Sequence, residues 1–292
     1  MDDDLLEAFE AERQHLVAVA YRMLGSIAEA EDVVQSAWVK LRTQEAREVV
    51  REPRAYLTTV VVRLALDSLR SARVRREKYV GPWLPEPVLT ETGAAFGSQG
   101  PRDLSSLSFA FLILLEALSP LERAAFLLHE VFDWTAPEIG RVLERDDAAI
   151  RQLVSRARAH VSDGAPRFPP SKEAHQNLLN GFLTTMASGD VNALAAMLAA
   201  DAVVRSDGGG VVKAARKVVR GAEHCAKLLV GIMRHMDFVP ELTVRELNGV
   251  PCLVWRQAGQ TAGVLTLTIE DARVTAVDLV LSPEKIRHLD PA

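Results

Sequence analysis

Cysteine, aromatic side chains and clustered histidine are all scarce in this chain of 292 residues. The two cysteines, Cys225 and Cys252, lack the CxxC spacing of zinc knuckles and redox pairs, so two reduced, buried thiols are expected. The seven histidines form neither an HExxH nor an HxxxH pattern. We therefore expect no metal site and no cofactor.

Long apolar runs are also missing. The longest, residues 109–118, is interrupted by Glu116 and is too short to span a bilayer. The chain starts with Met-Asp-Asp-Asp, which is acidic where a secretory signal is basic. A soluble, cytoplasmic protein with no membrane partner is expected. The apolar fraction of 48% and charged fraction of 25% are typical of globular proteins, and the length allows two or three domains.

The net charge of -5 conceals a strong local asymmetry. Residues 1–48 contain eleven acids and five bases, a balance of -6, whereas residues 51–78 contain eight bases and three acids, a balance of +5. Local basic segments, rather than the overall charge, indicate where a protein contacts nucleic acid.

The most informative segment is residues 147–161, DAAIRQLVSRARAHV. Its apolar residues recur at helical spacing, and its other faces carry bases and no acid after Asp147. The preceding Thr135-Ala-Pro-Glu138 has the form of a capping box that begins a shorter helix. Short helix, tight turn and basic helix form a helix-turn-helix pattern, with a solvated helix of a bundle as the alternative. The predicted DNA-binding residues are Arg151, Gln152, Ser155, Arg156 and Arg158.

Three helices are expected before residue 80. The first covers about residues 5–24, and the second begins at Ser26, which is placed to form a capping box with Glu29. The third runs from Pro53 to about Tyr79 and ends in the basic sequence DSLRSARVRREK. The arginines on or just beyond it that are expected to follow DNA phosphates are Arg54, Arg63, Arg70, Arg73, Arg75 and Arg76.

A proline-rich stretch, GPWLPEP, ends the third helix, and a second proline cluster follows residue 165. The remainder has another character. Helices are expected at residues 172–188, 191–198 and 223–236, and strands at residues 202–206, 238–247, 251–257, 263–269 and 274–281. Turns are expected at Asn248-Gly249 and Glu270-Asp271. These elements predict an α+β domain with helices on one face of a curved sheet.

Several motifs together resemble the bacterial extracytoplasmic-function RNA polymerase sigma factors, in the SigJ type that carries a C-terminal SnoaL-like domain. The segment AYRMLGSIAEAEDVVQSAWVKL resembles sigma region 2, and so does PRAYLTTVVVRLALDSLRSAR. The segment LSPLERAAFLLHEVFDWTAPEIGRVLERDDAAIRQLVSRARAHV resembles region 4. GPWLPEP and the DGGG at residues 207–210 resemble signatures of this subgroup, whereas Ser282-Pro-Glu-Lys-Ile286 departs from its usual Asn-Pro-Asp-Lys-Leu run.

The resemblance implies a multidomain fold, with two all-α sigma domains followed by an α+β SnoaL-like (NTF2-like) cone-shaped domain. The expected parts are region 2 at 1–80, a linker at 81–103, region 4 at 104–165, a short linker at 166–173 and the SnoaL-like domain at 174–292. Implied partners are the clamp and flap of core RNA polymerase and promoter DNA. Region 2 would contact the minus-ten element and region 4 the minus-thirty-five element. Asp32 and Gln35 resemble the clamp-binding positions.

The loop at residues 43–51 and the adjacent Trp38 or Tyr56 are candidates for holding a base of the opened strand, although buried packing is the favoured role for Trp38 and Tyr56. We expect the C-terminal domain to regulate the sigma regions, with activation and inhibition both open and a small ligand in its pocket as a further expectation. The residues expected to make this regulatory contact are Trp83, Leu84, Pro85, Asp207, Gly208, Gly209, Gly210, Pro283 and Lys285.

Two other functions remain open at this stage. A one-component helix-turn-helix regulator with a ligand-binding domain would require a dimer and would give residues 1–80 no role. An enzyme tethered to DNA would require a carboxylate or histidine in an apolar pocket. The candidates for such chemistry are Asp207, His224, Trp255 and Asp278. They form no recognisable catalytic constellation, so no catalytic residues are expected and structural roles are favoured.

Overall fold

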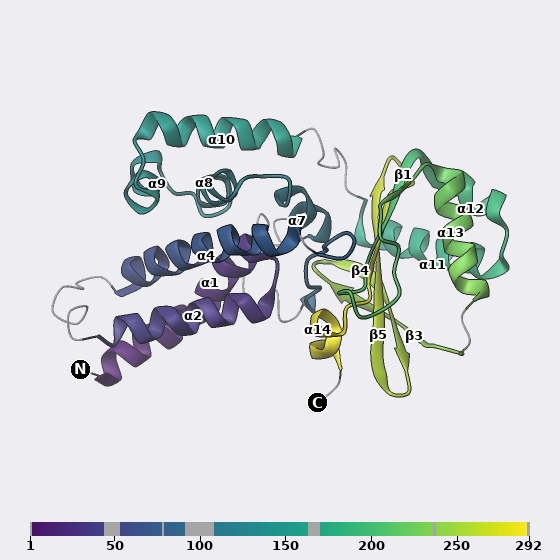
Figure 1. Ribbon diagram of the computed structural model, residues 1–292, viewed down its shortest axis with the longest axis horizontal. Coiled ribbons are helices and arrows are strands. Elements are labelled where there is room, and N and C mark those ends of the chain that lie inside the picture. The colour runs from purple at the N-terminus through teal and green to yellow at the C-terminus, as the bar shows by residue number, and fades with distance from the viewer. Residues whose placement is uncertain are drawn as a thin grey trace. The chain divides into compact units, whose positions relative to one another are not determined.

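The computed structural model describes residues 2–43, 53–77, 79–90, 108–162, 170–235 and 238–290 (Figure 1). The chain divides into two compact units. Unit 1 consists of Met1–Glu77 and Glu91–Ala165, and unit 2 of Lys78–Thr90 and Pro166–Ala292. Residues 79–90, which we call the linker segment, therefore belong with the C-terminal part of the chain.

Unit 1 is entirely helical in its described part. Its helices are α1 (Asp2–Leu24), α2 (Ile27–Leu41), α4 (Pro53–Glu77), α7 (Phe109–Leu115), α8 (Pro120–Glu130), α9 (Ala136–Leu143) and α10 (Asp147–Ser162). Gly25, with a φ of 71°, ends α1, and the Ser26 hydroxyl accepts a hydrogen bond from the backbone N–H of Glu29 to start α2. The expected break and cap are confirmed. The apolar faces of α1, α2 and α4 pack against one another, and α8 packs against α10.

The turn between α9 and α10 has the geometry of a helix-turn-helix. The carboxylate of Glu138 accepts hydrogen bonds from the backbone N–H and hydroxyl of Thr135, at 2.8 and 2.6 Å. At the other end of α9, Glu144 adopts a left-handed conformation. A Cβ atom on Gly140 would lie 2.6 Å from the carbonyl oxygen of Arg145, so only glycine fits this close turn. Asp146 then caps α10 by accepting from the N–H of Ala149.

Unit 2 is an α+β domain, as the sequence predicts. Its elements are α11 (Lys172–Ser188), α12 (Val191–Met197), β1 (Leu198–Asp207), β2 (Val219–Arg220), α13 (Ala222–Arg234), β3 (Glu241–Leu247), β4 (Val250–Gln257), β5 (Gln260–Glu270), β6 (Arg273–Val280), α14 (Pro283–Ile286) and η1 (Arg287–Leu289). The strand order is β2-β1-β6-β5-β4-β3, and β1 and β6 are parallel while the other pairs are antiparallel.

Helices α11, α12 and α13 lie together on one face of the sheet, and α14 lies on the other (Figure 1). The core forms between the sheet and the first three helices, from residues such as Phe182, Leu229 and Leu265. Cys225 and Cys252 are buried and unpaired, as expected, and burial raises the pKa of Cys252 to about 12. The Asn248-Gly249 turn is confirmed by positive φ values of 51° and 81°.

Some elements differ from the sequence prediction. The second expected turn lies one residue later, at Asp271 and Ala272, because these two residues adopt the positive φ values of 49° and 59° that a tight hairpin requires. The first strand starts at Leu198 rather than Ala202. Neither β2, with two residues, nor the four-residue α14 shows enough periodicity to be predicted.

Candidate functional site

The polar face of α10 is exposed along its whole length. Ile150, Val154, Ala157 and Val161 are buried against the rest of unit 1. All five predicted DNA-binding residues, Arg151, Gln152, Ser155, Arg156 and Arg158, are exposed. Glu130 of α8 accepts two hydrogen bonds from the Arg158 guanidinium, at 2.9 and 2.6 Å. Arg158 is thus held in place by an acid. The other four side chains lie on the solvent-facing side of α10.

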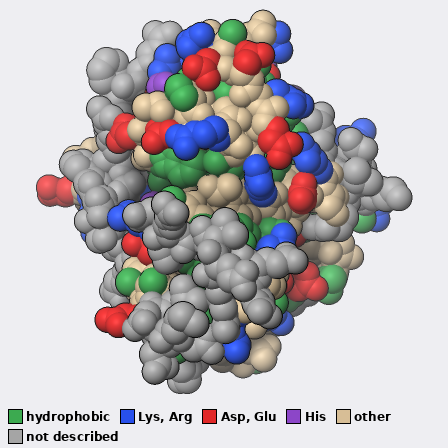
Figure 2. Space-filling view, turned by 90° about the vertical axis from the view of Figure 1, so that its left-hand side faces the viewer, with side chains coloured by type: hydrophobic (Ala, Val, Ile, Leu, Met, Phe, Trp, Pro, Cys, Tyr) green, Lys and Arg blue, Asp and Glu red, His purple; other side chains and the backbone are tan. Residues whose placement is uncertain are grey.

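The arginines of α4 do not form one free basic surface. Arg54 pairs with Glu12 at 3.2 Å and Arg70 with Asp67 at 3.1 Å. Arg63 donates to the carbonyl oxygen of Val142 at 3.2 Å and pairs with Glu144, also at 3.2 Å. It thereby joins α4 to the end of α9. The side chains of Arg73 and Arg75 lie outside the described residues. On the face drawn in Figure 2, Lys and Arg side chains are interspersed with Asp and Glu.

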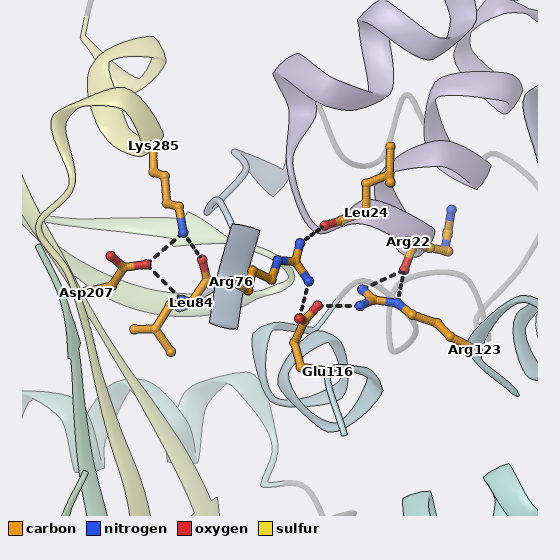
Figure 3. Close-up of polar contacts among 8 residues, drawn as sticks. All are labelled: Arg22, Leu24, Arg76, Leu84, Glu116, Arg123, Asp207 and Lys285. Carbon is orange, nitrogen blue, oxygen red and sulfur yellow. Dashed lines mark hydrogen bonds and ion pairs between the residues drawn. The ribbon is translucent and has the colours of Figure 1, made fainter. Parts of the chain in front are cut away.

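Arg76 lies inside unit 1, with its side chain 17% exposed. It donates to the carbonyl oxygen of Leu24 at 2.8 Å and pairs with Glu116. Arg123, only 2% exposed, donates to the carbonyl oxygen of Arg22 at 3.1 and 3.4 Å and pairs with the same Glu116 (Figure 3). Burial lowers the pKa of Arg76, and the charge of Glu116 opposes that effect.

This arrangement, which we call the arginine cluster, satisfies the end of α1. The last carbonyl groups of a helix have no partner within the helix and form the negative end of its dipole. Arg76 of α4 and Arg123 of α8 supply donors to two of these carbonyls, and Glu116 pairs with both guanidinium groups. The arginine cluster therefore fastens the helices before residue 78 to those after residue 107.

The surface of α2 carries the two residues that resemble clamp-binding positions. Asp32 and Gln35 are both exposed, while the neighbouring Val33 and Val34 are buried. Val39, which follows Gln35 by four residues and so lies on the same face, is 62% exposed. Val39 was not predicted, because the apolar period of α2 identifies the buried face and gives no sign of an apolar side chain on the exposed one. Trp38 is half-buried and stacks on Phe9, with ring centroids 4.7 Å apart.

In unit 2, the buried carboxylate of Asp207 gathers four donors. It accepts from the Tyr79 hydroxyl at 2.6 Å, from the N–H of Leu84 at 2.8 Å and from the N–H of Gly209 at 3.0 Å. The ammonium group of Lys285 lies 2.7 Å away (Figure 3). Burial, and then the hydrogen bond to Asp207, raises the pKa of Tyr79, so this hydroxyl stays protonated.

The linker segment is held by further contacts. Lys285 donates to the carbonyl oxygen of Leu84 at 2.5 Å and lies 4.0 Å from the centroid of the Trp83 ring. Asn248 and Val88 exchange two hydrogen bonds, at 2.8 and 2.9 Å. The carbonyl oxygen of Pro87 lies 2.8 Å from Nε2 of His288. Leu84, Pro85, Glu86, Pro87 and Val88 are all buried.

The structure thus brings together, within unit 2, three motifs that are far apart in the sequence. Gly208, Gly209 and Gly210 form the turn that follows Asp207. A Cβ on Gly208 would lie 2.2 Å from the carbonyl oxygen of Val212, and one on Gly209 would lie 2.5 Å from the Ser282 hydroxyl. Pro283 occupies the first turn of α14, which presents Lys285. Tyr79 of the linker segment, and Asn248 and His288, which contact that segment, were not predicted, because an isolated polar residue in a sequence does not indicate its partner.

The residues considered for catalysis have different surroundings. Asp278 is fully buried and binds Arg205 through two hydrogen bonds at 2.5 and 2.9 Å. Burial raises the pKa of Asp278, and Arg205 opposes that effect. His224 is exposed on α13. Of the four candidates, Trp255 is the one among the described residues that line the cavity of unit 2.

That cavity has a volume of about 710 Å³ and opens between α13 and the sheet. Leu183, Met186, Leu229, Leu265 and Trp255 contribute to its largely apolar wall. Of the described helices, none is both long and apolar enough to cross a membrane.

Comparisons with known proteins agree with this architecture. The model of sigma-70 region 2 matches residues 8–75, and that of sigma-70 region 4 matches residues 109–161. The ECF RNA polymerase sigma factor SigJ of Mycobacterium tuberculosis is 36% identical over 95% of this chain and 91% of its own length. A probable ECF RNA polymerase sigma factor of the same species, SigI, is 30% identical over 99% of this chain and 96% of its own.

The fold agrees as well. The crystal structure of M. tuberculosis SigJ superimposes with a TM-score of 0.75, covering 96% of this chain and 98% of that one at 33% identity. Both sigma regions and the C-terminal α+β domain are included in this match. The chain therefore belongs to the extracytoplasmic-function RNA polymerase sigma factors.

Proposed function

We propose that this alternative sigma factor contacts the minus-thirty-five element of a promoter through α10. The observation that carries this proposal is the exposed face of α10, which presents Arg151, Gln152, Ser155 and Arg156 to solvent. Arg and Gln make bidentate contacts with guanine and adenine in the major groove, and Ser holds phosphates. Arg158, paired with Glu130, would reach phosphate only after exchanging that acid for DNA.

Region 2 supplies the contacts to core RNA polymerase and the minus-ten element in this proposal. Asp32, Gln35 and the exposed Val39 form one face of α2 that combines charge, a hydrogen-bonding amide and an apolar side chain. Such a combination suits a protein interface better than a nucleic-acid one, since it contains no base. The clamp is its proposed partner and the flap that of region 4. Arg54, Arg63, Arg70, Arg73 and Arg75 are proposed to follow the minus-ten DNA, and Arg76 joins them only when the arginine cluster opens.

The compact form of unit 1 is, in this proposal, a resting form. A unit of about 150 residues has a radius of gyration of about 15 Å and is thus roughly 40 Å across. Two promoter elements two helical turns apart are separated by about 70 Å. Regions 2 and 4 must therefore separate to contact both elements, which breaks the arginine cluster and the contacts of Arg63 with Val142 and Glu144.

The C-terminal domain is proposed to modulate activity through the linker segment. The chain that connects region 2 (residues 1–80) to region 4 (residues 104–165) passes through residues 81–103, and residues 79–90 are bound to the C-terminal part of unit 2. Holding these residues restricts the chain that must extend when the two regions separate. Residues 166–173 are the proposed second linker and 174–292 the modulating domain, whose cavity we propose as the site of a small-molecule ligand. The protein is proposed to be cytoplasmic.

The promoter assignment predicts the effect of single substitutions on α10. Arg151→Ala and Arg156→Ala should each reduce initiation by roughly 5- to 150-fold, because a lost arginine contact to a base costs about 1–3 kcal/mol. The measurement is run-off transcription with purified core polymerase over a range of chain concentrations. Arg220→Ala, which removes an exposed arginine on β2, is the matched control and should be neutral.

The same assay separates this function from a one-component regulator. A sigma factor yields a specific transcript only with core polymerase and binds the promoter weakly alone. Tight, specific binding of the chain to DNA in a gel shift, without polymerase, would favour the one-component regulator. Wild-type initiation by both arginine variants would contradict the assignment of α10.

A further inference from the structure

The cavity of unit 2 combines apolar walls with a basic opening. Its volume of about 710 Å³ lies within the range of roughly 300–1,000 Å³ that is usual for small-molecule sites. The wall includes Leu183, Met186, Leu229, Leu253 and Leu265. A polar group buried there would lose its hydrogen bonds to water without compensation. A matching ligand therefore has a large apolar body, and its polar group lies at the opening.

The charged residues at the opening are all basic or potentially basic. Lys213, Lys227 and His235 line the cavity and are exposed, and none of the described lining residues is Asp or Glu. Lys227 already pairs with Glu223 at 2.5 Å. Lys213 is therefore expected to attract a negative group at the opening more strongly than Lys227 does. This charge pattern favours an anionic ligand over a cationic one.

The cavity also shares two wall segments with the residues that hold the linker segment. Ser206 and Ala215 line the cavity and are joined by a hydrogen bond of 2.8 Å, and Asp207 lies directly after Ser206. Leu281 lines the cavity and donates to the carbonyl oxygen of Asp207 at 2.7 Å, and it is followed four residues later by Lys285.

A direct contact completes this connection. A Cβ placed on Gly81 of the linker segment would lie 3.5 Å from the carbonyl oxygen of Ala215. The loop from Ser206 to Ala215 thus has the cavity on one side and the linker segment on the other. Because filling an apolar cavity restricts the residues that form its wall, occupancy and linker binding are expected to stabilise each other.

We propose that this cavity binds an amphiphilic monocarboxylate, a molecule with a long apolar body and one carboxylate, and that binding strengthens the hold of the rest of unit 2 on the linker segment. The site is a binding site without chemistry of its own. The proposal rests on the proposed modulation of the sigma regions through that segment, and it names the chemical class of the signal.

Isothermal titration of the full-length chain with dodecanoate, below its micelle concentration, tests the ligand class. Dodecanoate should bind at least about 5-fold more tightly than dodecylammonium, which has the same tail and the opposite charge. Lys213→Gln should weaken dodecanoate binding by about 2- to 5-fold, the range for an exposed ion pair. Lys217→Gln, an exposed lysine that does not line the cavity, should leave it unchanged.

Gly231 offers a variant that fills the cavity. It lies on α13 and lines the cavity, and a Cβ added to it would meet no heavy atom within 4 Å. Gly231→Phe should reduce dodecanoate binding by at least about 10-fold, because the ring occupies the apolar space. Gly231→Ala is the matched control and should bind as the wild type does. Absence of dodecanoate binding by the wild type, equal binding of dodecylammonium, or full binding by Gly231→Phe would each overturn the ligand assignment.

Hydrogen exchange tests the coupling to the linker segment. The amides of Leu84 and Val88 donate to Asp207 and Asn248, so their exchange reports whether the segment is held. Dodecanoate at a concentration that just saturates the wild type should slow the exchange of both amides there, and should slow it less in Gly231→Phe. Unchanged exchange in the wild type would overturn the coupling. Neither measurement uses polymerase. A chain that initiates transcription and binds no dodecanoate would therefore refute the ligand inference and leave the proposed function standing.

Discussion

Asp207→Asn is expected to release the linker segment from the rest of unit 2. The two carboxylate oxygens of Asp207 each accept from a backbone N–H, one from Gly209 and the other from Leu84. Either orientation of an asparagine amide places its NH2 group against one of these donors. The substitution also removes the charge that balances Lys285, which is 12% exposed at its side chain. Loss of a partner from a buried ion pair costs about 3–5 kcal/mol.

Two measurements check this result. The exchange of the Leu84 amide should accelerate by roughly 100-fold or more, since about 1.4 kcal/mol corresponds to a factor of ten. The urea midpoint for unfolding of unit 2 should fall as well. Asp271→Asn is the matched control, because Asp271 is exposed in a turn with a positive φ that asparagine tolerates. Wild-type exchange and an unchanged urea midpoint in Asp207→Asn would show that this carboxylate does not hold the segment.

Local signals made the helical parts predictable. The start of α9 was predicted from Thr135, Pro137 and Glu138, because a capping box requires neighbours only three residues apart. The buried stripe of α10 was predicted from its period. The α+β class of unit 2 was also predicted, since alternation and the Asn248-Gly249 turn are local signals.

Long-range contacts were much less accessible. Tyr79 and Asp207 are 128 residues apart, and Val88 and Asn248 are 160 apart, so no periodicity relates them. The motifs around Trp83, Asp207 and Lys285 were associated through a resemblance rather than through spacing. Arginines pose the same difficulty, since a basic helix predicts DNA binding whatever each side chain contacts. Arg76 instead caps the end of α1, a role that depends on where α1 and Glu116 lie.

Glu116→Gln is expected to loosen the joining of region 2 to region 4 within unit 1. Glu116 is the acid shared by Arg76 and Arg123, and its replacement leaves Arg123, 2% exposed, with a buried charge that no longer has a counterion in the arginine cluster. The expected loss of unfolding free energy is about 3 kcal/mol, at the low end for a broken buried pair because Glu116 is 21% exposed. Urea unfolding followed by circular dichroism measures it.

Glu144→Gln provides the matched control, because its pair with Arg63 also joins α4 to the α9 end but is exposed at both side chains, 49% and 77%. An exposed pair contributes about 0–1 kcal/mol, so this variant should unfold almost as the wild type does. If the compact unit 1 is a resting form, Glu116→Gln lowers the free energy needed to separate the two regions. Initiation at limiting core polymerase should then rise at temperatures where the variant remains folded, whereas Glu144→Gln should change it little. A folded Glu116→Gln chain that initiates less than the wild type would contradict the resting form and indicate that the arginine cluster belongs to the active arrangement.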